Sequence, residues 1–208
     1  MKLEIGYFSK RYYDEKKPTA GGFFPFVLEG TVHSVVDVTG IELYNNMDKF
    51  LIAWMKNIHA LPIYCCMLIY SEDEKAFEQQ CKELNVDYAY VTRNVNYSIA
   101  SVQLENDNHL QNMLPLLIGI ALTMNDLILW STNKNVFRVE QRQWVGADDG
   151  KLDDAVIVNM EPDTTVFWVS YDGDSIVIIS NEAQFATYET IIQTFPHFIQ
   201  PSLVEYEQ

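Results

Sequence analysis

The sequence predicts an α/β fold, with α+β as the alternative, in which helices flank a mixed β-sheet with a central strand–helix–strand crossover. Residues 63–70 (IYCCMLIY) form a continuous apolar run, which is typical of a strand buried on both faces of a sheet. A helical pattern and a second strand follow before residue 93. Together they match the length of a βαβ unit, about 30 residues, whose two strands run parallel. From residue 136 onward we expect antiparallel strands closed by a last helix.

The first 40 residues predict short strands and one long loop. Residues 2–8 alternate between apolar and polar side chains, so we expect a strand there. Residues 9–22 are polar, contain a proline and end in a glycine pair, which indicates an exposed loop. Two β-rich runs follow at 23–29 and 31–38. Pro25 places the first run at a sheet edge or at a bulge, because proline has no N–H to donate to a neighbouring strand.

Two helices are expected on either side of the apolar run at 63–70. In 46–58 the apolar residues recur with the 3.6-residue period of a helix, and they are Met47, Phe50, Leu51, Trp54, Met55 and Ile58. The second helix is expected to begin with a capping box formed by Ser71 and Glu74. Asn85 is the expected end of that helix, because asparagine tolerates the left-handed conformation of a helix terminus.

The middle of the chain continues with a strand, a helix and a strand. We expect strands at 97–104 and 127–131, with a helix within 108–124 between them. Pro115 should lie in the first turn of this helix or kink it, because proline cannot donate the backbone hydrogen bond of a helix interior.

The C-terminal segment predicts an antiparallel β part. Residues 136–145 alternate loosely, and three short strands follow at 155–160, 165–171 and 175–180. Asp172 and Gly173 between the last two indicate a hairpin, because glycine adopts the positive φ that such a turn requires. A final helix is expected at 182–195, where Pro196 ends the pattern.

We expect one globular domain over residues 1–208. The chain has no repeat and no low-complexity linker, and 48% of its residues are hydrophobic, enough for a substantial core. A possible subdivision separates an α/β part at 1–135 from an antiparallel β part with the C-terminal helix at 136–208.

No catalytic, cofactor or metal-binding motif is recognisable in the sequence. Phosphate-binding glycine loops, the G-x-S-x-G elbow and the usual zinc spacings are all missing. The four histidines are scattered, and the acidic loop at 148–154 lacks the ligand pattern of an EF-hand. We therefore expect no catalytic residue, no metal and no cofactor, and the interpretation favours a protein that is not an enzyme. The alternative is an enzyme whose site is assembled from distant residues.

A cytoplasmic location and no membrane contact are expected. The first ten residues lack the pattern of an export signal. The longest apolar run, 113–124, is shorter than the ~20 residues that span a bilayer. Cys65, Cys66 and Cys81 have no paired spacing, and adjacent strand residues point to opposite faces, so buried, reduced thiols are expected.

Charge is the most informative feature for function. The net charge is −15, which opposes direct binding to nucleic acid phosphates. Residues 139–208 hold 13 acidic and only two basic side chains, so most of the excess lies in the last third of the chain. We interpret this as a negative patch that binds a basic protein, with solubility as the alternative explanation. The candidate partner-binding residues are Asp148, Asp149, Asp153, Asp154, Asp172 and Asp174, with Trp144 or Trp168 as an aromatic anchor.

The function predicted from the sequence is that of a non-enzymatic, acidic protein-binding module of the immunity, antitoxin or inhibitor type. Its partner is expected to be a basic protein such as a nuclease or toxin. In composition alone, the chain is similar to bacterial immunity proteins and to phage proteins that present DNA-like charge, and no motif carries residues over. A small-ligand-binding protein and an oligomeric adaptor remain further alternatives.

Overall fold

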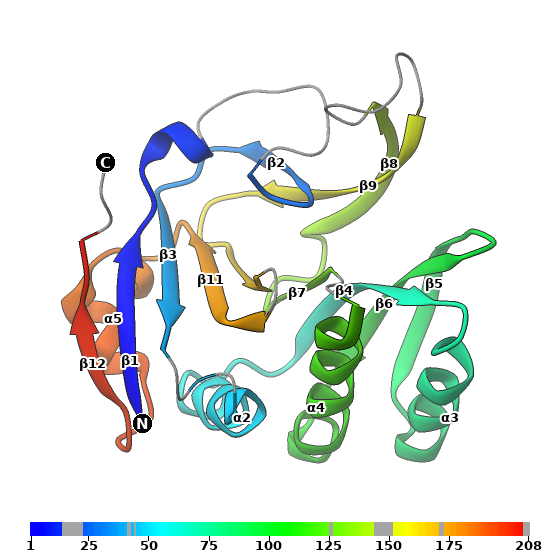
Figure 1. The fold of residues 1–208 in the computed structure, drawn as a ribbon, viewed down its shortest axis with the longest axis horizontal. Coiled ribbons are helices and arrows are strands. Elements are labelled where there is room, and N and C mark those ends of the chain that lie inside the picture. The colour runs from blue at the N-terminus through cyan, green and yellow to red at the C-terminus, as the bar shows by residue number, and fades with distance from the viewer. Residues whose placement is uncertain are drawn as a thin grey trace.

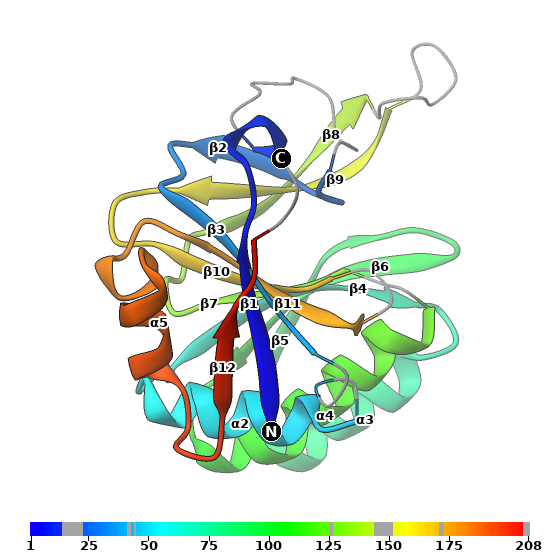
Figure 2. The same cartoon turned by 60° about the vertical axis from the view of Figure 1, so that its left-hand side comes forward.

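The fold, known here from a computed structural model, is mixed α/β, as the sequence predicts. The structure describes residues 1–13, 23–40, 43, 45–124, 127–143, 152–170 and 173–205. It consists of three layers: helices, a large sheet and a smaller sheet on the opposite face (Figures 1 and 2).

Nine strands form the large sheet, in the order β12-β1-β3-β11-β10-β7-β4-β6-β5. All hydrogen-bonded neighbours in it are antiparallel except β1 and β12, which pair in parallel. The strands are β1 (Lys2–Tyr7), β3 (Ser34–Thr39), β4 (Ile63–Tyr70), β5 (Asp87–Arg93), β6 (Tyr97–Leu104), β7 (Ile128–Ser131), β10 (Thr165–Val169), β11 (Ser175–Ser180) and β12 (Gln200–Leu203).

Three strands form the small sheet, in the order β2-β9-β8. They are β2 (Val27–Gly30), β8 (Phe137–Gln143) and β9 (Leu152–Met160). The helices lie on the other side of the large sheet (Figure 2). They are α2 (Met47–Asn57), α3 (Glu74–Leu84), α4 (Asp107–Met124), α5 (Tyr188–Thr194) and the 3-10 turn η3 (Ala183–Phe185). The 3-10 turn η1 (Lys10–Tyr12) follows β1 and lies on the side of the small sheet, near β2 (Figure 1).

The core between the large sheet and the helices is built around Trp54. The apolar stripe predicted at 46–58 is confirmed for Met47, Phe50, Leu51, Trp54 and Met55, which are all buried, while Ile58 ends the helix and is half-buried. The Trp54 ring meets Phe167 of β10 edge-on, with ring centroids 5.4 Å apart. Its indole N–H donates to Thr194 Oγ1 at 2.9 Å, so the polar atom of this buried ring is satisfied.

A second core lies between the two sheets. Phe24 and Phe26, just before β2, stack on each other and pack edge-on against Trp168 of β10. Gly30 ends β2 with φ of 95°, and a side chain there would collide with the carbonyl oxygen of Met160 on β9. The close approach of the two backbones therefore requires glycine at this position.

The predicted strand–helix–strand crossover is present, but it lies at one end of the sheet and not at its centre. Strand β4 has the predicted bounds, and α3 connects it to β5. The two strands run parallel but do not touch, because β6 inserts between them and pairs antiparallel with both. The pairing of β6 with both β4 and β5 cannot be predicted from the local sequence pattern, because it depends on contacts between separate segments.

The ends of α3 were predicted with mixed success. Asn85 ends the helix in the left-handed conformation, with φ of 54°, as predicted. The capping box is wrong: Ser71 Oγ donates instead to the Val95 carbonyl at 2.8 Å, and the carboxylate of Glu74 accepts from the hydroxyl of Ser98. Both side chains are drawn away from the helix by the β5–β6 hairpin.

Three further expectations differ in detail. Pro115 lies inside α4, so the alternative that placed it in the first turn is wrong, and the kink stays a prediction. The final helix is interrupted, because η3 ends before Thr187 caps α5 through Thr190. Strand β12 was not expected, and it forms by pairing with the start of the chain in β1.

The antiparallel C-terminal pairs were predicted, but their location was not. β10 pairs with β11, and β8 pairs with β9. However, β10 and β11 lie in the middle of the large sheet, and β9 pairs with β2 near the N-terminus. The possible boundary at residue 135 therefore does not separate the two sheets. That residues 1–208 fold as one cooperative domain stays a prediction.

Candidate functional site

Two of the predicted partner-binding residues serve the contact between the two sheets. Asp153 Oδ1, at the start of β9, accepts from the Tyr97 hydroxyl at 2.9 Å. Asp154 Oδ2 accepts from the Asn94 amide at 3.0 Å, and its other oxygen accepts from the amide of Gln141. Burial, together with the hydrogen bond to Asp153, raises the pKa of Tyr97 to about 12. These contacts form the inter-sheet cluster (Asn94, Tyr97, Asp153 and Asp154), which joins β9 to the β5–β6 hairpin.

The third described candidate, Asp174, lies elsewhere. It is exposed just before β11, where its carboxylate accepts from Ser170 Oγ at 3.1 Å and its carbonyl accepts from the Thr39 hydroxyl. Thr39 is the last residue of β3, at the end of the sheet that leads into α2. The described candidates therefore belong to different sheets: Asp153 and Asp154 lie in β9 of the small sheet, and Asp174 precedes β11 of the large sheet.

The remaining candidates have different outcomes. Asp148, Asp149, Asp172 and Trp144 lie outside the described residues. Trp168 is only 2% exposed and packs between the sheets, so its suggested role as an aromatic anchor for a partner is wrong.

Much of the charge on the outer face of the small sheet is neutralised internally. Arg142 of β8 contacts Glu140 at 2.7 Å and Glu29 of β2 at 3.1 Å, and Arg138 bridges the same two carboxylates. Hydrogen bonding to Arg138 lowers the pKa of Glu140. These ion pairs connect β8 with β2, the two outer strands of the small sheet.

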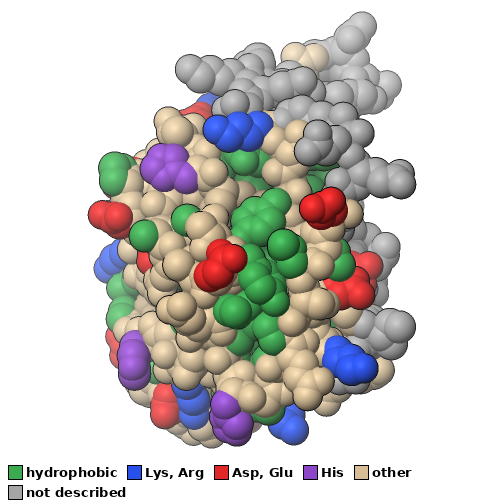
Figure 3. Space-filling view, turned by 90° about the vertical axis from the view of Figure 1, so that its left-hand side faces the viewer, with side chains coloured by type: hydrophobic (Ala, Val, Ile, Leu, Met, Phe, Trp, Pro, Cys, Tyr) green, Lys and Arg blue, Asp and Glu red, His purple; other side chains and the backbone are tan. Residues whose placement is uncertain are grey.

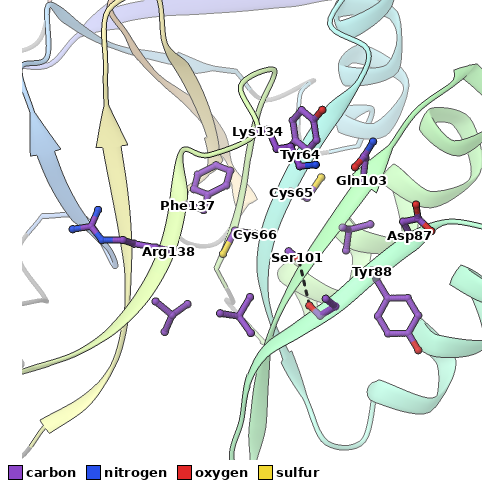
Figure 4. A pocket seen from close by; sticks show the side chains of 14 residues that line it. Tyr64, Cys65, Cys66, Asp87, Tyr88, Ser101, Gln103, Lys134, Phe137 and Arg138 are labelled. Atoms are coloured by element: carbon purple, nitrogen blue, oxygen red, sulfur yellow. Dashed lines mark hydrogen bonds between the residues drawn. The ribbon is translucent and has the colours of Figure 1, made fainter.

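A pocket of about 260 Å³ opens between β8 and the β4–β6–β5 end of the large sheet (Figure 4). Its lining is mostly apolar, with Ala89 and Val91 from β5 facing Phe137 and Val139 from β8. The small sheet covers the neighbouring strands but not this end, so Val91 remains 49% exposed. No local sequence pattern marks this pocket, because its residues come from four strands and the β7–β8 loop.

The mouth of the pocket is polar. Strand pairing aligns Asp87, Gln103 and Tyr64 in one row across β5, β6 and β4. Lys134, in the loop before β8, lines this pocket and an adjoining hollow of about 320 Å³, and Tyr64 is shared by both. Among the described residues, Lys134 has no ion-pair partner. The inter-sheet cluster lies beyond Val139, at the opposite end of β8 from Lys134.

The cysteines are buried, although Cys65 and Cys66 also belong to the lining of the pocket (Figure 4). All three thiols are free and buried, as expected. Cys65 faces the helix-side core and Cys66 faces the core between the sheets. Burial raises the pKa of Cys66 and of Cys81 to about 12, so both stay protonated and unreactive near neutral pH.

No metal site is found in the part of the chain that the structure describes. No group of three or more His, Cys, Asp or Glu side chains there could hold an ion. His109 is buried and uses Nδ1 to accept from the Glu105 N–H at 3.3 Å, which is a structural role at the start of α4. Among the described helices, none has the length and apolar character needed to cross a membrane.

Half-buried hydrophobic side chains and one exposed leucine lie at the β12 end of the sheet. Strand pairing places Tyr7 and Leu203 on the same face as the buried Ile5, and Leu203 is 52% exposed. The hydroxyl of Tyr188 on α5 donates to the Pro201 carbonyl at 3.1 Å, which holds this ring beside β12. Figure 3 shows an apolar strip on this side of the molecule, with acidic side chains in and beside it and most basic ones toward its margins. We call these residues, Tyr7, Tyr188, Pro201 and Leu203, the β12 surface.

Two acidic residues flank the β12 surface. Glu189 follows Tyr188 on α5 and is exposed. The pKa of Tyr7 is raised by the partial burial of its own ring and by the negative charge of Glu189. Glu205 lies just after Val204, whose N–H donates to the Ile5 carbonyl and prolongs the pairing of β12 with β1. The surface thus combines one exposed leucine and half-buried tyrosine and proline side chains with negative charge.

Comparisons with protein-family models, with curated proteins and with solved structures found no match to this chain. The fold and the surfaces described above are therefore the only basis for a functional conclusion.

Proposed function

We propose that this protein is a non-enzymatic binding module that docks a basic protein on its β12 surface. The observation that carries the proposal is the exposure of Leu203 beside Tyr7 and Tyr188 at an acidic edge of the sheet. Apolar and tyrosine side chains supply binding energy at protein interfaces, while the surrounding charge selects the partner.

The net charge supports a basic partner. At −15, the protein attracts a positively charged protein over distances of about 10 Å at 0.1 M salt and repels nucleic acid. An inhibitor, immunity or antitoxin role is one form that this binding would take. Asp153 and Asp154, which were predicted from the sequence to bind the partner, are not part of the proposed contact, because their carboxylates already accept hydrogen bonds within the protein.

The test begins with affinity purification from the organism that encodes the chain, followed by purification of any basic protein that is captured. Its affinity is then measured for the parent, for Leu203→Asp and for Val95→Asp. Val95 is a matched control because it is also apolar, is 92% exposed and lies at the β5–β6 hairpin, at the other end of the sheet. We expect Leu203→Asp to weaken binding at least tenfold, and Val95→Asp to leave it unchanged.

The second part of this experiment measures the association rate at increasing salt concentration. The association rate should fall as salt is raised, because the attraction between the opposite charges is screened. The proposal is wrong if no basic protein binds in purified form, or if the captured protein binds Leu203→Asp as tightly as the parent.

A further inference from the structure

We infer that the pocket between β8 and β5 binds a small apolar carboxylic acid, with its carboxylate at Lys134 and its apolar body between the two strands. This site is separate from the β12 surface, since β5 and β12 are the opposite edges of the large sheet. It therefore goes beyond the proposed function.

The shape of the pocket selects a narrow apolar body. Val91 and Ala89 on β5 are exposed, and Phe137 and Val139 on β8 are only half-buried, so the two walls present apolar surface to water. Covering such surface is favourable by about 25 cal/mol per Å². The volume of about 260 Å³ is slightly below the ~300–1,000 Å³ of drug-sized pockets, which indicates a ligand smaller than a typical drug.

The inner end of the pocket limits the length of the ligand. The inter-sheet cluster ties Asp154 of β9 to Asn94 of the β5–β6 hairpin, and Gln141 of β8 also contacts Asp154. A ligand that enters beside Tyr64 and Phe137 therefore meets polar, hydrogen-bonded side chains beyond Val139. We expect its apolar end to stop there.

The mouth selects the head group. Lys134 is exposed, lines both the apolar pocket and the polar hollow next to it, and has no ion-pair partner among the described residues. The other cation in the lining, Arg138, already contacts Glu29 and Glu140, and Figure 4 shows its side chain directed away from the pocket. Lys134 is thus the cation that a carboxylate can reach, and ammonium groups bind carboxylates through charge-assisted hydrogen bonds. Asp87 also lines the pocket but not the adjoining hollow, so the carboxylate is expected on the side of Lys134 that faces the hollow, away from Asp87.

Three eight-carbon probes test the head-group preference: octanoate, octanol and octylamine, measured by titration calorimetry. We expect octanoate to bind most tightly and octylamine most weakly. Lys134→Gln should weaken octanoate binding about tenfold, as expected for loss of a charged hydrogen bond, and leave octanol unchanged. Lys82→Gln is the control, because Lys82 is exposed on α3 outside the pocket.

A blocking variant tests the location. Ala89→Trp fills the groove from an exposed position on an edge strand, whereas Ala76→Trp places the same side chain on the exposed surface of α3. We expect the first to abolish octanoate binding and the second to preserve it, with thermal melts confirming that both variants fold. The inference is overturned if the parent shows no saturable binding of octanoate, if octylamine binds as well as octanoate, or if folded Ala89→Trp still binds it.

Discussion

The two faces of the nine-stranded sheet are covered in different ways. On the helix side, Trp54, Trp130 and Phe167 are at most 1% exposed, so that face is closed over the strands between the two sheet edges, and Leu203 is exposed only at the β12 edge. On the other side, the small sheet buries Trp168 and its neighbours but leaves Val91 half-exposed at the β5 end. The closed face provides stability, while the partly covered face leaves room for a ligand. Substitutions on the two faces should therefore have very different effects.

The largest effect is expected on the helix side. Trp54→Ala should lower the free energy of unfolding by about 3–5 kcal/mol, the usual cost of removing a large buried aromatic side chain. Trp54 is fully buried, contacts rings from β10 and from the C-terminal segment, and donates a hydrogen bond to Thr194. Denaturant unfolding measures the change. A midpoint close to that of the parent would show that this core is not the main source of stability.

A smaller effect is expected where the two sheets are joined. Asp153→Ala should cost about 1–2 kcal/mol, because it leaves the half-buried Tyr97 hydroxyl without its acceptor. Asp174→Ala is the matched comparison: this exposed carboxylate should contribute less than about 0.5 kcal/mol. Equal losses in urea unfolding would mean that the inter-sheet cluster adds no stability.

The inter-sheet cluster should also make stability depend on alkaline pH. The pKa of Tyr97 is raised from 10.0 to about 12 in the folded protein, so the unfolded chain loses this proton first. The stabilisation is fully present below pH 10.0 and is lost as the pH rises toward 12. Tyr97→Phe removes this titration, and its stability should fall less steeply over that range. Parallel pH profiles for parent and variant would contradict this role of Tyr97.

The smallest effect is expected inside the pocket. Val91→Ser should change the free energy of unfolding by less than about 0.5 kcal/mol, because Val91 already lies partly in water on an edge strand. The same substitution should weaken octanoate binding, since the wall loses apolar surface. A loss above ~2 kcal/mol in the unfolding experiment would indicate that Val91 belongs to the core.

The contrast between the faces also explains how far the sequence could predict the fold. Strand 63–70 and the Trp54 stripe were predicted correctly, because buried elements require apolar side chains at regular positions along the chain. Strand β12 has no such pattern and contains Pro201, and it exists because the edge of β1 accepts it. The insertion of β6 between β4 and β5 is likewise decided by pairing between distant segments.

The candidate sites were harder to predict, for the same physical reason. Asp153 and Asp154 look like solvated turn residues in the sequence, but in the structure both accept hydrogen bonds from the β5–β6 hairpin. The pocket brings together Tyr64, Val91 and Lys134, which belong to segments with no shared spacing. Only the packing of one sheet on the other makes them neighbours.

The difference between the two faces is tested most directly by thiol modification. The native cysteines are buried, and burial raises the pKa of Cys66 and Cys81 to about 12, so the parent should not react with a disulfide reagent at pH 8. Val91→Cys places a thiol in the pocket, and Ala100→Cys places one on the closed face, where Ala100 is fully buried. We expect the first to react rapidly and to be protected by octanoate, and the second to react only on unfolding. Equal rates for the two variants, in folded protein, would contradict the account.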